Sequence, residues 1–246
     1  MLAEAPLKAF RALLNKTFPN RSNTLNRNQL KWQSLIICIF SQNFILDMDK
    51  QFQINAFRAG IAQFVTFTDV EWEMLTQYLD FSTLDKKEYF AVEGKVCDYM
   101  AFIVQGALRY HHIKDGQEIT GYFSFENEFA SAYKSFIKRT PSTNYIQALE
   151  ETKLILISHS NFQKMLNNPL LALKIERFGR LIAEYYICCY EDRVTSFIIQ
   201  SAEERYTELE KTRRDIFQRV PQHFIANFLG ITPVSLSRIR KRTLLQ

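Results

Sequence analysis

The sequence contains few of the residues that build disulfide frameworks or metal sites. Only four cysteines occur among its 246 residues, and two of them, Cys188 and Cys189, are adjacent and cannot easily pair with each other. No Cys-x-x-Cys pair and no Cys/His cluster at zinc spacing is present. We therefore expect neither a disulfide scaffold nor a metal or iron–sulfur site, and we interpret the cysteines as reduced, buried thiols.

Long hydrophobic runs are also missing. The longest apolar run near the N-terminus, residues 35–40, is far shorter than the roughly 18 residues of a membrane span, and no small-residue cleavage site follows it. A hydrophobic content of 47% and a charged content of 23% are close to those of an average soluble protein, which excludes a disordered or collagen-like chain. We expect a cytoplasmic globular protein of one or two domains without a membrane partner.

Positive charge is concentrated at the C-terminal end. Residues 211–246 carry eight Lys or Arg side chains and one acid, Asp215, so this segment contributes +7 to a chain whose net charge is +5. Because the segment also shows apolar periodicity, the asymmetry is typical of a folded nucleic-acid-binding module. A merely solvated basic surface would show the same composition, so charge alone leaves that alternative open.

The pattern of the chain changes at Met48. Residues 1–47 show no sustained hydrophobic period, whereas apolar side chains between Ile54 and Phe64 recur at spacings of three and four and predict a helix. A capping box from Thr68 to Glu71 predicts a second helix. We interpret residues 1–47 as an extension that is either disordered or not native, with Met48 as the biological start in the second case.

Residues 81–157 carry short β-rich runs separated by turn signals. Because Gln105-Gly106 and the hairpin signal at residues 114–117 are tight turns, we expect the first three strands to form a meander. Two later runs supply further strands, and the segment predicts a small antiparallel β-roll or jelly roll in a protein of α+β class. The runs cover residues 99–104, 107–113, 118–123, 144–149 and 153–157.

Helical periodicity follows the strands and continues to the end of the chain. Residues 158–167 predict a short helix, and Pro169 opens a long one. Apolar residues of the long helix step by four and three, which is typical of a coiled-coil seam, although a core helix packed on the roll would show the same period. We interpret it as a dimerisation helix over residues 168–199. The predicted seam consists of Leu171, Ile175, Phe178, Ile182, Tyr185 and Cys189.

The strongest local signal is a helix-turn-helix pattern at residues 222–241. Ala226 supplies the small residue where two helices cross, and Gly230 supplies the turn position where φ is positive. Thr232 is a natural N-cap, with Pro233 at the first helical position. The sequence thus predicts a β-roll domain over residues 48–167 and a DNA-binding helix-turn-helix domain over residues 200–246.

The second helix of this pattern exposes hydroxyl and cationic side chains away from its apolar face. Hydroxyls bind phosphates or bases, and arginine makes bidentate contacts to guanine. A helical hairpin that merely packs does not require a cationic outer face. The predicted contacts to double-stranded DNA are Thr232, Ser235, Ser237, Arg238, Lys241 and Arg242.

A roll, a long helix and a C-terminal helix-turn-helix together resemble the Crp/Fnr family of bacterial transcription regulators, over about residues 50–246. Phe102–Gly106 with Asp115–Glu118 is similar to the family's cyclic-nucleotide-type roll. Ala202–Tyr206 is similar to the segment after its dimer helix, and Leu229–Thr232 with Ser237-Arg238 resembles its recognition unit. The resemblance implies a homodimeric, sequence-specific DNA-binding regulator, a base contact from Arg238, and RNA polymerase as a candidate partner.

Departures from the family pattern bear on the ligand. The family's nucleotide-binding members hold the cyclic phosphate with a Gly-Glu pair and an Arg-Ser or Arg-Thr pair, and these fall here at Ser131-Ala132 and Ser142-Thr143. We expect these four residues to mark the effector pocket, and because the carboxylate and the guanidinium are missing, we do not expect cyclic AMP to bind. The chain ends soon after the recognition helix, so we expect a winged-type domain with a truncated wing.

Other chemistries receive less support from the sequence. Adjacent residues of a strand point to opposite faces, so at most one of His111 and His112 faces inward as a haem ligand. The alternative function is a cupin-like metal-dependent enzyme or a ligand-binding roll, but cupin sites use His-x-His, which places both rings on one face. No catalytic motif stands out, and we expect neither an enzyme nor a cofactor.

Overall fold

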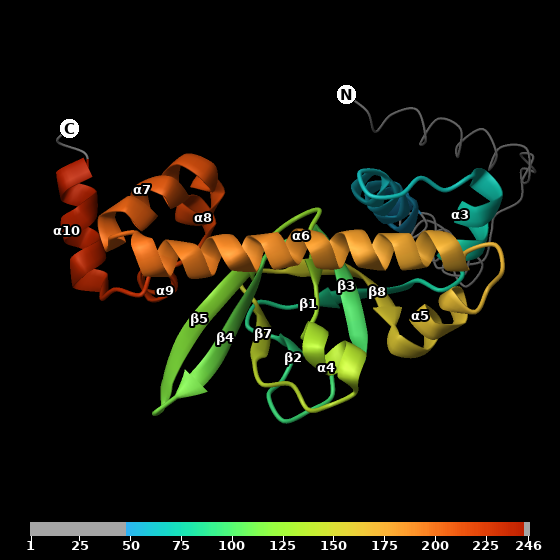
Figure 1. Ribbon diagram of the computed structural model, residues 1–246, viewed down its shortest axis with the longest axis horizontal. Coiled ribbons are helices and arrows are strands. Elements are labelled where there is room, and N and C mark those ends of the chain that lie inside the picture. The colour runs from blue at the N-terminus through green and yellow to red at the C-terminus, as the bar shows by residue number, and fades with distance from the viewer. Residues whose placement is uncertain (1–47, 244–246) are drawn as a thin grey trace, which may run out of the picture. The chain divides into compact units, whose positions relative to one another are not determined.

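A computed structural model describes residues 48–243 (Figure 1). The predicted extension, residues 1–47, therefore lies outside the described residues. The chain divides after Asp49 into two units, and the structure described below belongs to the second, Lys50–Gln246. Within the described range, no helix combines the length and the apolar character needed to cross a membrane.

Within residues 48–243, two helical segments precede the first strand. Residues 48–62 are helical, and α3 spans Asp69–Thr76. The predicted capping box is present: Thr68 Oγ1 accepts a hydrogen bond from the backbone N–H of Glu71, while the Thr68 N–H donates to the Glu71 carboxylate at 2.7 Å. These bonds satisfy N–H groups that a helix start leaves without intrahelical partners.

Eight strands form the roll as two four-stranded antiparallel sheets, which confirms the α+β class and the predicted architecture. One sheet has the order β1-β8-β3-β6 and the other β2-β7-β4-β5. Apolar side chains from both sheets, among them Ile103, Leu108 and Leu154, fill the space between them. The strands are β1 Asp80–Leu84, β2 Tyr89–Ala91, β3 Tyr99–Gln105, β4 Leu108–Lys114, β5 Gln117–Ser124, β6 Phe129–Ala130, β7 Tyr145–Ala148 and β8 Thr152–Ser158.

The predicted meander is wrong at its first turn. β4 and β5 form the expected hairpin, with Asp115 and Gly116 both at positive φ, but β3 pairs with β8 and β6 instead of β4. The Gln105-Gly106 turn passes the chain from one sheet to the other. Gly106 has φ +104°, and a Cβ there would lie 2.7 Å from the Glu151 carbonyl oxygen, so the crossing requires glycine.

Helices α4, α5 and α6 pack on the roll together with the N-terminal helices. α4 is a short helix at Tyr133–Lys138, α5 spans His159–Leu166 with Ser158 as its N-cap, and α6 spans Ala172–Ile199. In Figure 1, α6 runs across the sheets as one long, uninterrupted helix. α5 confirms the predicted short helix, and the long helix begins a few residues after Pro169.

The predicted coiled-coil seam requires correction, because most of it is buried within this chain. Leu171, Ile175, Phe178 and Ile182 are at most 5% exposed and belong to the core between α6, the N-terminal helices and the roll. A side chain already covered by its own chain cannot face a second subunit. The period therefore reports packing of α6 on the roll and the N-terminal helices of its own chain. Of the six predicted residues only Tyr185 is exposed, and Cys189 is half-buried.

Four further helices follow α6: α7 Ala202–Thr212, α8 Arg214–Arg219, α9 Gln222–Phe228 and α10 Pro233–Thr243. Their apolar faces form a separate core around Tyr206, Ile216 and Leu236. Phe123 and Phe125, at the end of β5 and just after it, also belong to this core. The C-terminal helices are therefore packed against the roll in this structure.

Candidate nucleic-acid interface and effector cavity

The helix-turn-helix is built by α9 and α10 as the sequence predicts. Ala226 is fully buried where the two helices meet, with Ile225 and Leu236 beside it. The Ile231 N–H donates to the Ala226 carbonyl at 2.9 Å, which closes the turn after α9. The inner faces of both helices are thus fixed by apolar packing.

Gly230 occupies the turn with φ +72°, a conformation that side chains with a Cβ rarely adopt. A Cβ at this position would also lie 2.9 Å from the ring of Phe197 at the end of α6. Thr232 then starts α10: its Oγ1 accepts a hydrogen bond from the Ser235 N–H at 3.1 Å. Backbone conformation and capping together set the angle at which α10 leaves the turn.

The outer face of α10 carries the predicted DNA-contacting residues in unequal states. Ser237, Arg238 and Lys241 are exposed, and no described residue forms a hydrogen bond or ion pair with the cationic groups of the last two. Because their cationic groups are already free and hydrated, they can reach phosphates or base edges without breaking an internal contact. They are the most available members of the predicted set.

Three other predicted residues are already engaged. Thr232 and Ser235 lie 3.0 Å apart through their hydroxyls, and Ser235 is half-buried. Arg242 forms an ion pair of 2.6 Å with Glu203 at the start of α7, which raises the pKa of Arg242. A phosphate would have to replace this carboxylate, so Arg242 is a weaker candidate for an electrostatic contact than Lys241.

Sequence reasoning missed the contacts that hold α9 against the β4–β5 hairpin. Asn227 Oδ1 accepts a hydrogen bond from the backbone N–H of Thr120 on β5. The guanidinium of Arg109 on β4 lies 3.7 Å from the ring centroid of Phe224 and pairs with Glu118. The sequence does not predict the bond between Asn227 and Thr120, because 107 residues separate them in the chain.

His111 lies fully buried beside this contact region, while His112 is exposed, as the strand alternation predicts. The ring of His111 stacks on Tyr145 at 5.2 Å, and neither ring nitrogen has a hydrogen-bond partner. Burial, reinforced by the charge of Arg109, lowers the pKa of His111 to about 4. Its Nε2 lies 3.9 Å from Glu118, and no cluster of three or more potential ligands exists among residues 48–243.

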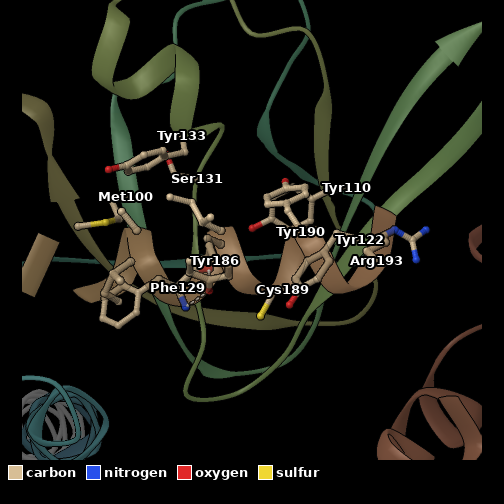
Figure 2. A pocket seen from close by; sticks show the side chains of 14 residues that line it. Met100, Tyr110, Tyr122, Phe129, Ser131, Tyr133, Tyr186, Cys189, Tyr190 and Arg193 are labelled. Carbon is tan, nitrogen blue, oxygen red and sulfur yellow. Dashed lines mark hydrogen bonds between the residues drawn. The ribbon is translucent and has the colours of Figure 1, made fainter. Parts of the chain in front are cut away.

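A cavity of about 250 Å³ lies between α6 and the roll (Figure 2). Buried side chains form its floor, while Tyr133, Ile187 and Tyr190, which are 49% to 62% exposed, form its rim. Its lining residues are Met100, Tyr110, Tyr122, Phe129, Ala130, Ser131, Tyr133, Ile182, Ala183, Tyr186, Ile187, Cys189, Tyr190 and Arg193.

Of the four predicted effector residues, the lining of this cavity includes one. Ser131 lines the cavity, but Ala132, Ser142 and Thr143 do not. Ser142 is buried and its hydroxyl is bonded within its own loop to Asn144, while the Thr143 carbonyl lies 2.7 Å from His112 Nδ1. The nearby cation, Arg139, donates to the Cys97 carbonyl and pairs with Asp98, so it is not free to bind a phosphate.

Comparison with known proteins agrees with this geometry. Residues 81–168 match the model of the cyclic nucleotide-binding domain. No protein of curated function matches the sequence. The match covers the strands of the roll and α5, so the roll belongs to the class of cyclic nucleotide-binding domains.

Solved structures extend the likeness beyond the roll. FixK2 from Bradyrhizobium japonicum is 19% identical, with a TM-score of 0.56 over 68% of this chain and 85% of that chain. A protein assigned to the Crp/Fnr family of transcriptional regulators, from Eubacterium rectale, is 16% identical, with a TM-score of 0.58 over 73% and 84%. CLP, the c-di-GMP-responsive global regulator of Xanthomonas campestris, is 13% identical, with a TM-score of 0.55 over 70% and 90%.

These likenesses establish the fold. The chain contains a cyclic nucleotide-binding domain and has the fold of the Crp/Fnr transcriptional regulators, which confirms the resemblance inferred from its motifs.

Proposed function

We propose that this protein is a sequence-specific DNA-binding transcription regulator and not an enzyme. The observation that carries the proposal is a complete helix-turn-helix whose second helix presents Ser237, Arg238 and Lys241 to solvent. A helix of this kind fits the major groove and reads base edges with its outer side chains. The Crp/Fnr fold supports the proposal, because the proteins assigned to it in the comparisons include transcriptional regulators.

We further propose that the protein binds DNA as a homodimer through a different face of α6 from the predicted seam. Ile187, Tyr190 and Val194 are all more than half exposed and step by three and four. This stripe is rotated by roughly a third of a turn from the buried face of the helix. Apolar residues at these spacings are typical of a coiled-coil seam, so a second copy of α6 is the occupant we assign.

A two-fold dimer would place two α10 helices on half-sites about 34 Å apart, one helical turn of DNA. Arg238 is the residue we assign to base recognition, and Lys241 to a phosphate. Val234 is exposed in the first turn of α10, at the position where some members of the family have a glutamate. Valine cannot accept a hydrogen bond from cytosine as that carboxylate does, so the operator should differ from the operators of those members. RNA polymerase remains a predicted partner on the strength of the family resemblance alone.

Selection of binding sites from random DNA, followed by titrations on specific and scrambled duplexes, tests the function. We expect Arg238→Ala to cost about 1 to 3 kcal/mol on the specific site and to relax preference at one base pair per half-site. Lys241→Ala should weaken all sequences alike and reduce the salt slope by about one unit. Arg177→Ala, an equal loss of charge on an exposed position of α6, is the matched control.

An unchanged ratio of specific to scrambled affinity in Arg238→Ala would show that α10 does not read the bases. The functional conclusion would then reduce to non-specific binding of nucleic acid.

A further inference from the structure

We propose that the contact between α9 and the β4–β5 hairpin is a pH-sensitive switch, which opens when the buried side chain of His111 takes up a proton. Opening separates α9 from the hairpin. The inference goes beyond the proposed function, because it concerns α9 and the roll in the absence of DNA. This docking contact consists of Arg109, His111, Glu118 and Thr120 on the hairpin and Phe224 and Asn227 on α9.

The docking contact lies on the outer face of the sheet β2-β7-β4-β5. Leu108 belongs to the core between the two sheets, so Arg109 and His111, which follow it at odd spacings on β4, point to the opposite face. Thr120 is the cross-strand partner of His111 and shares that face. All three polar residues are nonetheless buried. The Phe224 ring of α9 lies 3.7 Å from the Arg109 guanidinium, so α9 helps to exclude water from this face.

Two contacts fix α9 to β5. In the described part of the chain β5 is the edge strand of its sheet, and an edge strand leaves N–H groups without a partner strand. The Thr120 N–H donates instead to Asn227 Oδ1 on α9. The ring of Phe228 packs on that of Phe123, with centroids 5.3 Å apart. The Thr120 amide therefore reports directly on whether α9 is docked.

Polar side chains beneath α9 are incompletely hydrogen-bonded. Both ring nitrogens of His111, the Thr120 hydroxyl and two of the Arg109 guanidinium nitrogens find no hydrogen-bond partner among the described residues. The third guanidinium nitrogen, Nη2, donates to Glu118. A buried polar group without a partner has a higher free energy than the same group in water. Opening of the docking contact hydrates these groups, which offsets part of the loss of apolar contact.

The surroundings of His111 on the sheet disfavour a proton on its ring. Arg109 on the same face of β4 already carries a positive charge, and His112, the next residue, adds a second basic group. Tyr145 of β7 stacks on the ring at 5.2 Å, and Tyr89 of β2 lies 6.2 Å from it. Neither tyrosine ring replaces the hydration that an imidazolium requires.

One acidic side chain acts in the opposite direction. Glu118 on β5 lies 3.9 Å from His111 Nε2, but its carboxylate is already paired with Arg109. On α9, His223 is a basic group near Glu118, and the sequence of α9 contains no acid. Burial and the charge of Arg109 therefore prevail over Glu118, and the pKa of His111 is lowered to about 4.

Protonation and docking therefore oppose each other. When α9 moves away, water reaches His111 and its pKa returns toward 6.5. The open form then binds the proton more tightly, so docking weakens as the pH falls from 6.5 toward 4. Between about pH 7.5 and about pH 5.5, these two pKa values predict a shift toward the open form of up to about tenfold.

Hydrogen exchange at the Thr120 amide of the full-length protein tests the switch. Rates at about pH 7.5 and about pH 5.5 are divided by the intrinsic rate at each pH, which gives a protection factor. We expect protection to fall several-fold, and at most about tenfold, in the wild type. It should remain unchanged in His111→Phe, whose ring cannot be protonated. His112→Gln, which removes the neighbouring exposed histidine, is the matched control and should behave as the wild type.

Two results would overturn the proposal. An equal loss of protection in the wild type and in His111→Phe would show that another group takes up the proton. Amides of β3 bond to β8 and β6 within the roll. If the Thr120 amide exchanged only together with these amides at both pH values, the opening would be global unfolding instead of separation of α9.

Titration of the His111 ring by NMR tests the same contact in the wild-type protein. We expect the ring to titrate near 4, and Phe224→Ala, which uncovers Arg109, to move the pKa toward 6.5. A His111 ring that titrates near 6.5 in the wild type would refute the switch, even if His111→Phe fails to fold. None of these measurements uses DNA, so their failure would leave the proposed function untouched.

Discussion

Replacing Phe178 by alanine tests which face of α6 packs on the roll. The Phe178 side chain is 4% exposed, and its ring lies 5.2 Å from that of Phe129 and 6.0 Å from that of Phe64. Deleting a buried phenylalanine side chain removes its transfer free energy and leaves a cavity, at a cost of about 3 to 5 kcal/mol. In a protein of this size that loss corresponds to a fall in Tm of about 6 to 20 °C.

Val194→Asp is the matched change on the exposed face of the same helix. Val194 is 57% exposed, so we expect little change in the unfolding of the chain and a loss of the dimer. Urea unfolding followed by circular dichroism measures the first property, and light scattering at several protein concentrations measures the second. Both variants are needed, because dimerisation also adds to apparent stability and makes it depend on concentration.

The reverse result would refute this assignment of faces. If Phe178→Ala halved the mass in light scattering while its unfolding free energy at low concentration stayed unchanged, the predicted seam of Leu171 to Cys189 would be the dimer contact. If Val194→Asp left the dimer intact, the exposed stripe would not be the seam.

Three further predictions concern pH, the turn and the nucleotide. The folded state lowers the pKa of His111 from 6.5 to about 4, so the unfolded chain binds more protons than the folded chain between these two pH values. The free energy of unfolding should therefore fall by at most ~1.4 kcal/mol per pH unit as pH decreases through this range. In urea titrations at pH 4 to 7, roughly the window set by the two pKa values, His111→Phe should flatten this slope. Gly230→Val should cost about 1 to 3 kcal/mol, since it strains a positive φ and meets the Phe197 ring, and hydrogen exchange should show earlier opening of α10; protection equal to that of the wild type would contradict the turn assignment. Cyclic AMP at physiological concentration should give no saturable heat in calorimetry, because Ser142 replaces the expected arginine and Arg139 is engaged; tight binding would point to another cation, first Lys134.

The helix-turn-helix could be predicted from the sequence because it depends on local interactions. Positive φ at Gly230, the cap at Thr232 and the burial of Ala226 all involve residues that are close together in the sequence. The same holds for the capping box at Thr68 and the Asp115-Gly116 hairpin. Each of these features depends on backbone conformation and nearby hydrogen bonds, which a short stretch of sequence specifies.

Features that join distant segments could not be read in this way. A tight turn at Gly106 is compatible with a hairpin or with a crossing between sheets, and only pairing with β8, some 50 residues later, decides between them. The tyrosines of the cavity come from β4, β5, α4 and α6, and no spacing relates them. Asn227 contacts Thr120 only because the C-terminal helices are packed on the β4–β5 hairpin.

The hydrophobic period of α6 illustrates both what the sequence specifies and what only the tertiary structure decides. Steps of four and three established that one stripe of the helix must be covered, because apolar side chains at that spacing share a face. The identity of the covering surface is a tertiary property: the roll and the N-terminal helices bury Phe178 and Ile182, and the stripe through Ile187 and Val194 is left open. By itself the sequence determined that α6 is amphipathic and where the two helices α9 and α10 and the turn between them lie, whereas only the packing of distant elements decided which apolar face is already occupied.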